Sequence, residues 1–330
     1  MRHCEALVDV MAISEFDLIN KYFKKDLGGY GVALGIGDDC ALLNVPMGKT
    51  LATSMDTLVG GNHFPKNADP ELIAERAMRV NLSDLAAMGA EPMWYTLGLT
   101  MPSADEYWLD GFTRGLFRAG QEFNCALVGG DTTRGPLSLT IQVMGSVELD
   151  SALQRSGARV GDRIYVTGTL GDGAAGVAVI KQELQVGKSA FNYFMGHYYR
   201  PTPRLKEGVM LRDLASAAVD ISDGLMAELG HICTASGVGA EIRWEDVPVS
   251  EALNKLATEE QVVKWALTGG DDYELCFTVP ENNVRQLEHL IAMNKIDATE
   301  VGVITGGRDV LCKNQGRVMS VSQSGFQHFG

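Results

Sequence analysis

Aspartate recurs in this chain in five short segments at the ends of strand-like runs, and four of these segments contain glycine. The five segments are residues 35–39, 54–56, 129–133, 220–224 and 269–272. Carboxylates on tight turns suit hard cations such as Mg²⁺, which takes oxygen ligands and bridges protein carboxylates to substrate phosphates. A chain that uses all five in this way must fold so that distant segments meet at one polyanion site.

A structural role is the simpler interpretation for any single segment, because Gly and Asp are common turn residues. The doublets Asp38-Asp39 and Asp271-Asp272 weaken that interpretation for the whole set. Adjacent carboxylates repel each other unless a cation lies between them. We therefore expect the series as a whole, and no single member of it, to report on function.

Strand-like and helix-like runs alternate along the chain, which predicts an α/β fold with mixed layers. In the first half, Ser14 begins a short expected helix through Phe23, and Asp69 with Pro70 begins a longer one over 69–88. A third helix is expected over 105–123. Expected strands cover 32–36, 40–45, 50–54, 93–101, 126–128 and 137–147.

The second half alternates more regularly. Its expected strands cover 163–167, 217–221, 240–244 and 274–279, with three short strands at the end of the chain. Its expected helices cover 173–184, 205–214, a segment ending near 235, two segments up to about 267, and 283–293. Because 330 residues are long for one hydrophobic core, we expect two domains, 1–150 and 151–330, joined by the polar stretch 150–161.

The charge balance excludes some partners. A formal net charge of −14 argues against nucleic acid, whose binding needs a basic surface, and against an anionic membrane. An acidic protein that handles phosphates must obtain positive charge elsewhere, and bound metal ions are the obvious source.

The six cysteines are scattered, with no pair at metal-binding spacing, and several lie in apolar runs. This usage fits a reducing compartment, and we expect a cytoplasmic location. The first residues lack the layout of a signal peptide. The most apolar stretch, residues 85–101, contains Glu91 and Pro92 and is not expected to span a membrane.

Several phosphate-binding motifs are missing. The sequence has no P-loop and lacks the motif set of protein kinases. The glycine-rich stretch 168–176 follows an expected strand and opens a helix, but it does not match a dinucleotide fingerprint, so we interpret it as a structural turn. No histidine stands in a catalytic grouping, although His63 lies in a loop beside Asp56. Arg204 follows a rigid Pro-Thr-Pro turn as a possible partner of an anion or carboxylate.

Taken in order, the motifs resemble those of the thiamine-monophosphate kinase family, within the superfamily of proteins like aminoimidazole ribonucleotide synthetase (PurM-like). The resemblance runs from about residue 14 to 329. The matching stretches are 35–41, 56–64, 81–89, 129–135, 201–204, 220–224, 269–274 and 325–326. It implies a two-domain PurM-like fold in which N-terminal sheets of two subunits pair into a homodimer.

The resemblance also implies an activity: the γ-phosphoryl group of ATP passes directly to thiamine monophosphate, which completes thiamine diphosphate biosynthesis. It implies several Mg²⁺ ions, with these candidate ligands: Asp39, Ser54, Asp56, Asp84, Asp131, Asp220 and Asp223. The implied ATP contacts are Gly130, Arg155 and Ser222. The implied thiamine-phosphate contacts are His63, Asp271 and Phe326. One departure is Met55, where the family often has Thr, so a side-chain metal contact is lost there.

The chemistry needs no general base. The attacking group is a phosphate oxygen, which is largely ionised at pH 7 because its second pKa is about 6. The reaction instead requires that two polyanions be positioned and neutralised.

Three alternatives remain open at this stage. The first is another ATP-using enzyme of the superfamily, of the aminoimidazole ribonucleotide synthetase, selenophosphate synthetase or hydrogenase-maturation type. The second is a multi-metal phosphohydrolase. The third is a Mg²⁺- or nucleotide-binding module without catalytic activity.

Overall fold

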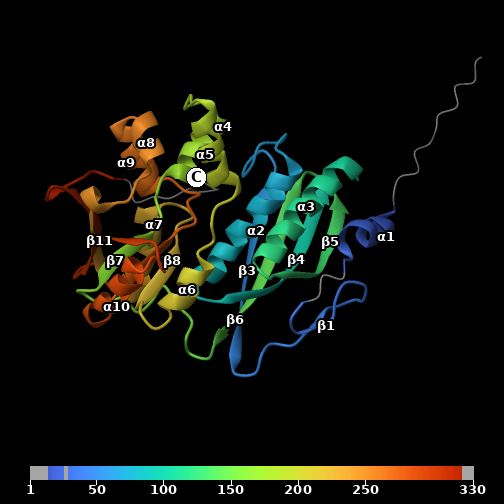
Figure 1. Ribbon diagram of the computed structural model, residues 1–330, viewed down its shortest axis with the longest axis horizontal. Helices are drawn as coiled ribbons and strands as arrows, with labels where there is room; N and C mark the ends of the chain where they lie inside the picture. Colours follow the sequence, from blue (N-terminus) through green and yellow to red (C-terminus); the bar gives the residue numbers. More distant parts are fainter. Residues whose placement is uncertain (1–13, 26–28, 322–330) are drawn as a thin grey trace, which may run out of the picture.

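The computed structural model describes residues 14–25 and 29–321. They form two α/β halves, each built on its own sheet, with one long helix between the sheets (Figure 1). None of the helices in these ranges is long and apolar enough to cross a membrane. The mixed α/β class and the two-part organisation predicted from the sequence are confirmed.

The first half contains a four-stranded sheet in the order β3-β6-β4-β5. Its strands are β3 (Lys49–Val59), β4 (Glu91–Met101), β5 (Ala126–Arg134) and β6 (Ser138–Glu148). The β4–β5 pair is parallel and the other pairs are antiparallel. Helices α2 (Pro70–Ala87) and α3 (Glu106–Glu122) pack on one face and bury a shared apolar core.

Helix α2 begins where the sequence predicts. The Asp69 carboxylate accepts a hydrogen bond from the Glu71 backbone N–H at 2.8 Å, and Pro70 occupies the first turn, where its missing N–H costs nothing. Almost the whole helix is buried, including charged residues, because it packs against the sheet, against α3 and against the second half of the molecule.

Small elements complete the first half. They are α1 (Glu15–Leu18), a π-helical turn η1 (Ile19–Phe23), β1 (Val32–Leu34) and β2 (Leu42–Leu43). Tyr22 and Phe23 of the turn are buried in the core beside α3. The β1–β2 pair covers part of the sheet face opposite the helices, where the Trp94 Nε1–H donates to the Tyr30 carbonyl at 2.9 Å.

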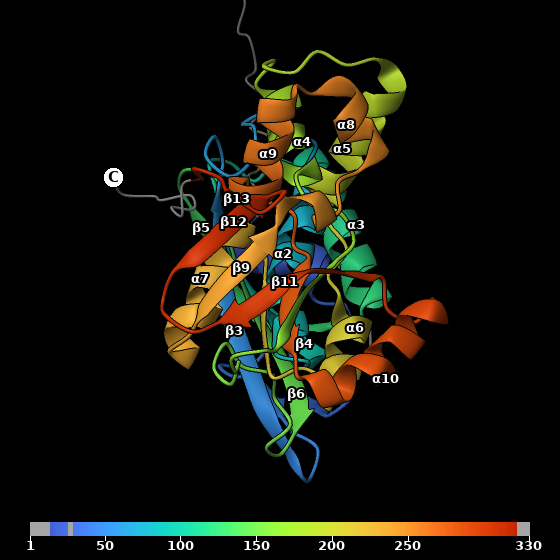
Figure 2. The same ribbon diagram turned by 90° about the vertical axis from the view of Figure 1, so that its left-hand side faces the viewer.

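The second half contains a seven-stranded sheet in the order β13-β12-β9-β11-β7-β10-β8. The strands are β7 (Arg163–Thr167), β8 (Ala217–Asp220), β9 (Gly239–Arg243), β10 (Leu275–Val279), β11 (Ala298–Thr305), β12 (Val310–Asn314) and β13 (Arg317–Val318). Figure 2 shows β12, β9 and β11 side by side. Only the β9–β12 pair is parallel.

Helices cover both faces of this sheet. They are α4 (Asp172–Ile180), α5 (Lys188–Tyr199), α6 (Leu205–Leu211), α7 (Leu225–Ser236), α8 (Glu251–Leu256), α9 (Glu259–Thr268) and α10 (Glu281–Ala292), with a 3₁₀ turn η2 (Trp244–Asp246). Residues of α7 share one core with the sheet, and residues of α6 and α10 share another. Helices α4, α5, α8 and α9 gather at one end of this half in both views (Figures 1 and 2).

Helix α2 belongs to both halves. Its last turn places Ala86 and Ala87 in the core that α6 and α10 form with the second sheet. The Arg212 guanidinium on the α6 side donates to the Gly89 carbonyl at 2.6 Å just beyond the helix. The carboxylates that α2 carries are therefore fixed relative to both sheets.

The structure corrects several expectations. Asp56 lies within β3, which extends to Val59, and Asp131 lies within β5, so neither stands on the turn that the sequence predicted. The β3–β6 ladder runs through Ser54, Met55 and Asp56 without a register shift. The Gly129-Gly130 pair is accommodated by a register shift in the β4–β5 ladder. Helix α5 was not predicted, and the helix expected through Phe23 becomes π-helical after Leu18.

Close approach of α2 and α3 makes the chain sensitive at Gly115. A Cβ atom there would lie 2.1 Å from the Glu71 carbonyl oxygen of the facing helix, where backbone cannot move aside cheaply. We expect Gly115→Ala to lower the free energy of unfolding by about 1–3 kcal/mol. Gly230→Ala on α7 is the matched control, because its added Cβ would meet nothing within 4 Å.

Urea denaturation of both variants checks this. The control should gain stability by roughly 0.5–1 kcal/mol from the higher helix propensity of alanine. Equal effects of the two substitutions would contradict the helix contact as the cause.

Candidate active site

Three carboxylates from both halves meet beside α2, and we call Asp56, Asp84 and Asp220 the carboxylate cluster. Asp56 lies on β3, Asp84 on α2 and Asp220 at the end of β8. The Ser54 hydroxyl donates to Asp84 Oδ2 at 2.5 Å, and the Ser83 hydroxyl donates to Asp220 Oδ2 at 2.8 Å. The strand and the helix are locked together where Asp56 N–H donates to the Asn81 side-chain oxygen at 2.9 Å.

The cluster has too little positive charge around it. Loss of hydration, and then the Asp84 carboxylate, raises the pKa of Asp56 to about 6, although its side chain still reaches solvent. Burial, followed by the neighbouring Asp84, raises the pKa of Asp220 to about 7. Burial also raises the pKa of Asp84, against the opposing effects of the Ser54 hydrogen bond and the nearby Arg155. Poorly hydrated carboxylates that lie this close together favour a bound cation.

The donor set fits Mg²⁺ and not a softer metal, since it consists of carboxylate and hydroxyl oxygens. Within the part of the chain that the structure describes, no three His, Cys, Asp or Glu side chains converge closely enough to hold a metal ion by themselves. An ion held at this cluster therefore needs further oxygens from water or from substrate phosphates, which is how Mg²⁺ is usually bound.

Other predicted ligands stand on neighbouring segments. Asp223 follows β8, and its backbone N–H donates to Glu228 Oε1 at 3.3 Å. Asp39 lies in the loop after β1, and Asp131 lies on the edge strand β5 at the opposite side of the sheet from β3. Both are exposed, and neither is among the groups, within the described residues, that shift the pKa values of the three carboxylates. The structure thus unites Asp56, Asp84 and Asp220, and leaves Asp39 and Asp131 apart from them.

The predicted ATP contacts also lie at different places in the structure. Arg155 is exposed and interacts electrostatically with both Asp84 and Glu228, which places it beside the carboxylate cluster. Ser222 donates to Glu228 Oε1 at 3.1 Å. Gly130 lies on β5, where a Cβ atom would come within 2.0 Å of the Leu97 carbonyl oxygen, so strand packing alone already requires glycine there.

Asp271 is linked to the cluster by Tyr273, which interacts electrostatically with Asp271, Asp220 and Asp56. Arg76 Nη2 donates to Asp271 Oδ1 at 2.5 Å, and the Tyr273 hydroxyl donates to the same oxygen at 3.2 Å. Burial alone would lower the pKa of Arg76, but Asp271, Tyr273 and Tyr198 together raise it, so the guanidinium stays charged. Burial and Asp271 raise the pKa of Tyr273, with further contributions from Asp220 and Asp56.

His63 approaches the same region from the first half. Its Nδ1 accepts a hydrogen bond from the Val59 backbone N–H at 2.9 Å, and its carbonyl oxygen accepts one from the Tyr198 hydroxyl at 2.7 Å. Tyr198 in turn contacts Arg76, whose guanidinium lies 4.1 Å from the centre of the tyrosine ring. Phe326, the third predicted substrate contact, lies outside the described residues.

One member of each Asp doublet accepts hydrogen bonds from the backbone. Asp272 accepts hydrogen bonds from the backbone N–H groups of Gly171 and Gly173 at 2.8 and 3.1 Å, and so occupies the amino end of α4. The glycine-rich stretch there is therefore a structural turn, as predicted. Asp38 accepts a hydrogen bond from the Asp39 N–H at 2.9 Å.

Arg204 pairs with a carboxylate, which is one of the two kinds of partner that the sequence predicted for it. Its Nε and Nη2 atoms bind the two oxygens of buried Glu274 at 2.5 and 2.6 Å. The fork geometry of arginine suits this bidentate contact and fixes the turn before α6. Arg204 therefore has a structural role.

Three residues of the site were not predicted from the sequence: Arg76, Tyr198 and Tyr273. Arg76 sits in a helix segment rich in charged residues and looks like part of a solvated face. Tyr198 lies on helix α5, which was not predicted. The available signal was the spacing of Phe194 and Tyr198, which places them one turn apart on the same helix face.

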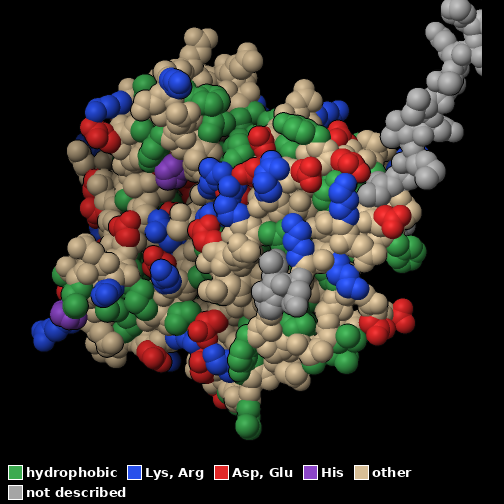
Figure 3. Space-filling view, turned by 45° about the vertical axis from the view of Figure 1, so that its right-hand side comes forward, with side chains coloured by type: hydrophobic (Ala, Val, Ile, Leu, Met, Phe, Trp, Pro, Cys, Tyr) green, Lys and Arg blue, Asp and Glu red, His purple; other side chains and the backbone are tan. Residues whose placement is uncertain are grey.

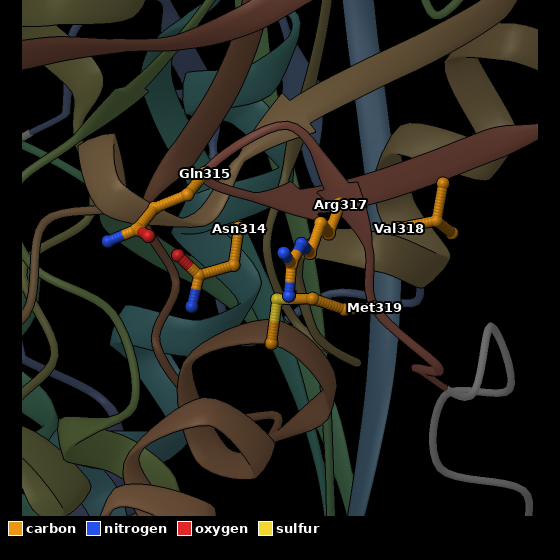
Figure 4. Close-up of a pocket in the computed structure, with 5 residues that line it drawn as sticks. All are labelled: Asn314, Gln315, Arg317, Val318 and Met319. Carbon is orange, nitrogen blue, oxygen red and sulfur yellow. The ribbon is translucent and has the colours of Figure 1, made fainter.

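Other surface features offer less. Figure 3 shows basic side chains beside acidic ones on one face, and ion pairs such as Arg79–Glu122 at 2.6 Å join α2 and α3. A shallow hollow of about 430 Å³ lies at the turn between β12 and β13 (Figure 4). Its lining residues are Asn314, Gln315, Arg317, Val318 and Met319. Since they include no carboxylate, the hollow cannot bind a hard cation as the carboxylate cluster can.

The sequence matches two family models in succession. Residues 37–147 match the AIR synthase related protein, N-terminal domain, and residues 159–312 match the AIR synthase related protein, C-terminal domain. The chain is 49% identical to thiamine-monophosphate kinase of Escherichia coli (strain K12) over 322 residues, which cover 97% of this chain and 99% of that protein.

Solved structures agree with this result. The crystal structure of thiamine-monophosphate kinase from Stenotrophomonas maltophilia K279a has a TM-score of 0.83 and 40% sequence identity, covering 94% of this chain and 99% of that one. The structure of AaThiL complexed with AMPPCP and TMP has a TM-score of 0.76 and 31% identity, covering 95% and 96%. With its carboxylate cluster and two-sheet fold, the chain belongs to the thiamine-monophosphate kinase family of AIR synthase related proteins.

Proposed function

We propose that this chain phosphorylates thiamine monophosphate with ATP to give thiamine diphosphate, the last step of thiamine diphosphate biosynthesis. The observation that carries the proposal is the carboxylate cluster, which is short of positive charge, lies near Arg155, and is linked through Tyr273 to Asp271. One side of such a site suits metal-bound phosphates, and the other suits a cationic thiazolium ring.

Transfer is direct and in line. A phosphate oxygen of thiamine monophosphate forms a bond to the γ-phosphorus of ATP, and the bond from that phosphorus to the bridging oxygen breaks, leaving ADP. Mg²⁺ supplies the neutralising charge for both phosphates when it is bound. Asp56, Asp84, Asp220 and Asp223, assisted by Ser54, would hold it. Asp39 and Asp131 stay proposed ligands, at positions separate from the carboxylate cluster.

The remaining site residues orient the two substrates. Arg155 and Ser222, with the backbone at Gly130, contact ATP. His63 and Asp271 contact the thiamine phosphate, and Phe326 stacks on its pyrimidine ring. Because the attacking phosphate is already ionised, no residue of this chain acts as a general base.

A homodimer is part of the proposal. Side chains alternate along β3, so Leu51, Met55 and Val59 lie on the face opposite Ser54 and Asp56, and all three are unusually exposed for apolar residues. A second copy of the sheet would cover them. The same alternation explains why Met55 is tolerated next to the cluster, since its side chain is directed away from it.

Residues 1–150 form the domain that carries most metal ligands and the dimer contact, and residues 151–330 form the domain that completes the ATP and substrate sites. We place the protein in the cytoplasm, because the cysteines within the described ranges are free thiols and four of them are buried.

A product assay tests the function. The purified chain is incubated with ATP and Mg²⁺, with and without thiamine monophosphate, and the products are separated by chromatography. We expect thiamine diphosphate and ADP in equal amounts only when thiamine monophosphate is present. Phosphate release that does not depend on it would favour a phosphohydrolase, and ATP binding without turnover would favour a binding module.

Replacement of one cluster carboxylate should separate stability from function. Asp84→Asn removes a charge that repels Asp56 and Asp220. Without divalent cations, its melting temperature should therefore exceed that of the wild type. The stabilisation that Mg²⁺ gives the wild type should be lost, and turnover should fall by on the order of 100-fold or more.

Asp110→Asn, an exposed position on α3, is the control and should leave all three quantities unchanged. An Asp84→Asn protein that is as active as the wild type would remove Asp84 from the metal site.

The raised pKa of Asp220 predicts how stability depends on pH in the absence of cations. An acid with a higher pKa in the folded state binds more protons there, so the folded state loses stability as pH rises from about 4 to about 7. Asp220→Asn lacks this loss. Relative to the wild type, it should gain on the order of 1–3 kcal/mol in free energy of unfolding between pH 5 and pH 8.

Urea denaturation at the two pH values, in a chelating buffer, measures this difference. Asp213→Asn, an exposed position after α6, should show the same difference from the wild type at both pH values. If Asp220→Asn behaves like Asp213→Asn, the carboxylate cluster is not under electrostatic strain.

A further inference from the structure

Arg76 joins the two segments that contact the thiamine phosphate under the proposed function. It lies on α2 in the first half, and its side chain is only 4% exposed. One terminal nitrogen donates to Asp271 Oδ1 and the other donates to the Tyr198 carbonyl oxygen, each at 2.5 Å. Its guanidinium stacks on the Tyr198 ring at 4.1 Å and lies 5.9 Å from the Tyr273 ring.

We infer that Arg76 is a positioning residue for the substrate pocket: it holds the Asp271 carboxylate and the Tyr198–His63 contact in the arrangement that receives thiamine monophosphate. This inference rests on the proposed function. It concerns affinity for the thiamine phosphate and leaves ATP binding to other residues.

The two oxygens of the Asp271 carboxylate have different roles: Oδ1 binds protein groups, and Oδ2 is left for a ligand. Both recorded donors, Arg76 and the Tyr273 hydroxyl, bind Oδ1. The side chain keeps 25% of its surface exposed, so Oδ2 is available to a donor or a positive charge on the substrate. Arg76 is buried, and each of its terminal nitrogens donates to a protein oxygen, so its guanidinium is held by the protein.

Backbone geometry shows that this orientation is imposed. Asp271 has φ of 71° and Tyr273 has φ of 53°. Both angles lie in the left-handed region of backbone conformation that residues other than glycine rarely adopt. Such strain persists where surrounding contacts determine the conformation, and it concentrates at functional sites. Here the Asp271 N–H donates to the Ser222 carbonyl at 2.9 Å, and Arg76 together with the Tyr273 hydroxyl holds the side chain.

Through Tyr198, the second terminal nitrogen of Arg76 is linked to His63, the other proposed substrate contact. The Tyr198 carbonyl accepts from Arg76, the Tyr198 ring packs under the guanidinium, and the Tyr198 hydroxyl donates to the His63 carbonyl at 2.7 Å. One buried cation therefore sets the spacing between His63 and Asp271, which come from different halves of the chain.

Arg79 provides a matched comparison on the same helix. It is nearly as buried and also pairs with a carboxylate, Glu122, but its partners lie on α3 and at Pro201, and none is a proposed substrate contact. A purely structural role for buried arginines of α2 would give both residues the same consequences on substitution.

The test measures steady-state kinetics of the full chain with ATP and Mg²⁺, varying each substrate in turn. Arg76→Met should raise KM for thiamine monophosphate by roughly tenfold or more while KM for ATP changes by less than about twofold, since a lost binding contact acts on one substrate. Arg76→Lys should fall between the wild type and Arg76→Met, because a single ammonium cannot serve both acceptors. Arg79→Met should leave both KM values unchanged.

A double-mutant cycle removes the remaining structural explanation. If Arg76 acts through Asp271, then Arg76→Met combined with Asp271→Asn should raise KM for thiamine monophosphate hardly more than Asp271→Asn alone. Effects that multiply independently would overturn the inference, as would equal increases in both KM values. If Arg76→Met does not fold, the Lys variant and Tyr198→Phe carry the test, and an unchanged KM for thiamine monophosphate in both would overturn it.

The outcome is distinguishable from failure of the proposed function. A wild-type chain that makes no thiamine diphosphate contradicts the function itself. A wild-type chain that makes it, with Arg76→Met showing wild-type KM for thiamine monophosphate, contradicts only the role of Arg76.

Discussion

The packing of helix α2 against both sheets is the contact on which the rest of the structure depends. Its middle lies in the core of the first half, and its end lies in a core of the second. Its polar residues reach outward from this rigid position: Asn81 and Asp84 toward β3, Ser83 toward Asp220, and Arg76 toward Asp271. A site assembled from both halves can keep a fixed geometry because one nearly fully buried helix carries its central residues.

Burial on α2 also explains the electrostatics of the site. Carboxylates in water would remain charged without cost, whereas here limited hydration and mutual repulsion raise the pKa values of Asp56 and Asp220 toward neutrality. The free protein therefore tolerates an arrangement that is unfavourable by itself. That arrangement is favourable only in the presence of cations, as expected for a site that has to attract metal-bound polyanions.

The sequence predicted the fold class, the long helices and most strands, because periodicity and capping residues are local signals. It located Asp56, Asp84 and Asp220 as members of one site through their ordered resemblance to a family. It could not show that Asp131 lies inside a strand, since glycine beside aspartate looks like a turn until the partner strand is known. It also ended the strand before Asp56 at residue 54, whereas β3 continues to Val59. It also missed Arg76 and Tyr198, whose roles depend on contacts between α2 and an unpredicted helix, and such contacts leave no local pattern.

In the doublet Asp271-Asp272, two identical neighbouring residues have different contacts and different roles. The left-handed backbone at Asp271 sends consecutive carboxylates to different surroundings, one toward Arg76 and the other to the amino end of α4. Under the proposed function, changes at the first position would alter what the protein binds, whereas changes at the second would alter the fold at the amino end of α4. Related chains could therefore vary the first Asp as their ligands diverge and still retain the second, so that a motif read as one unit would evolve as two independent positions.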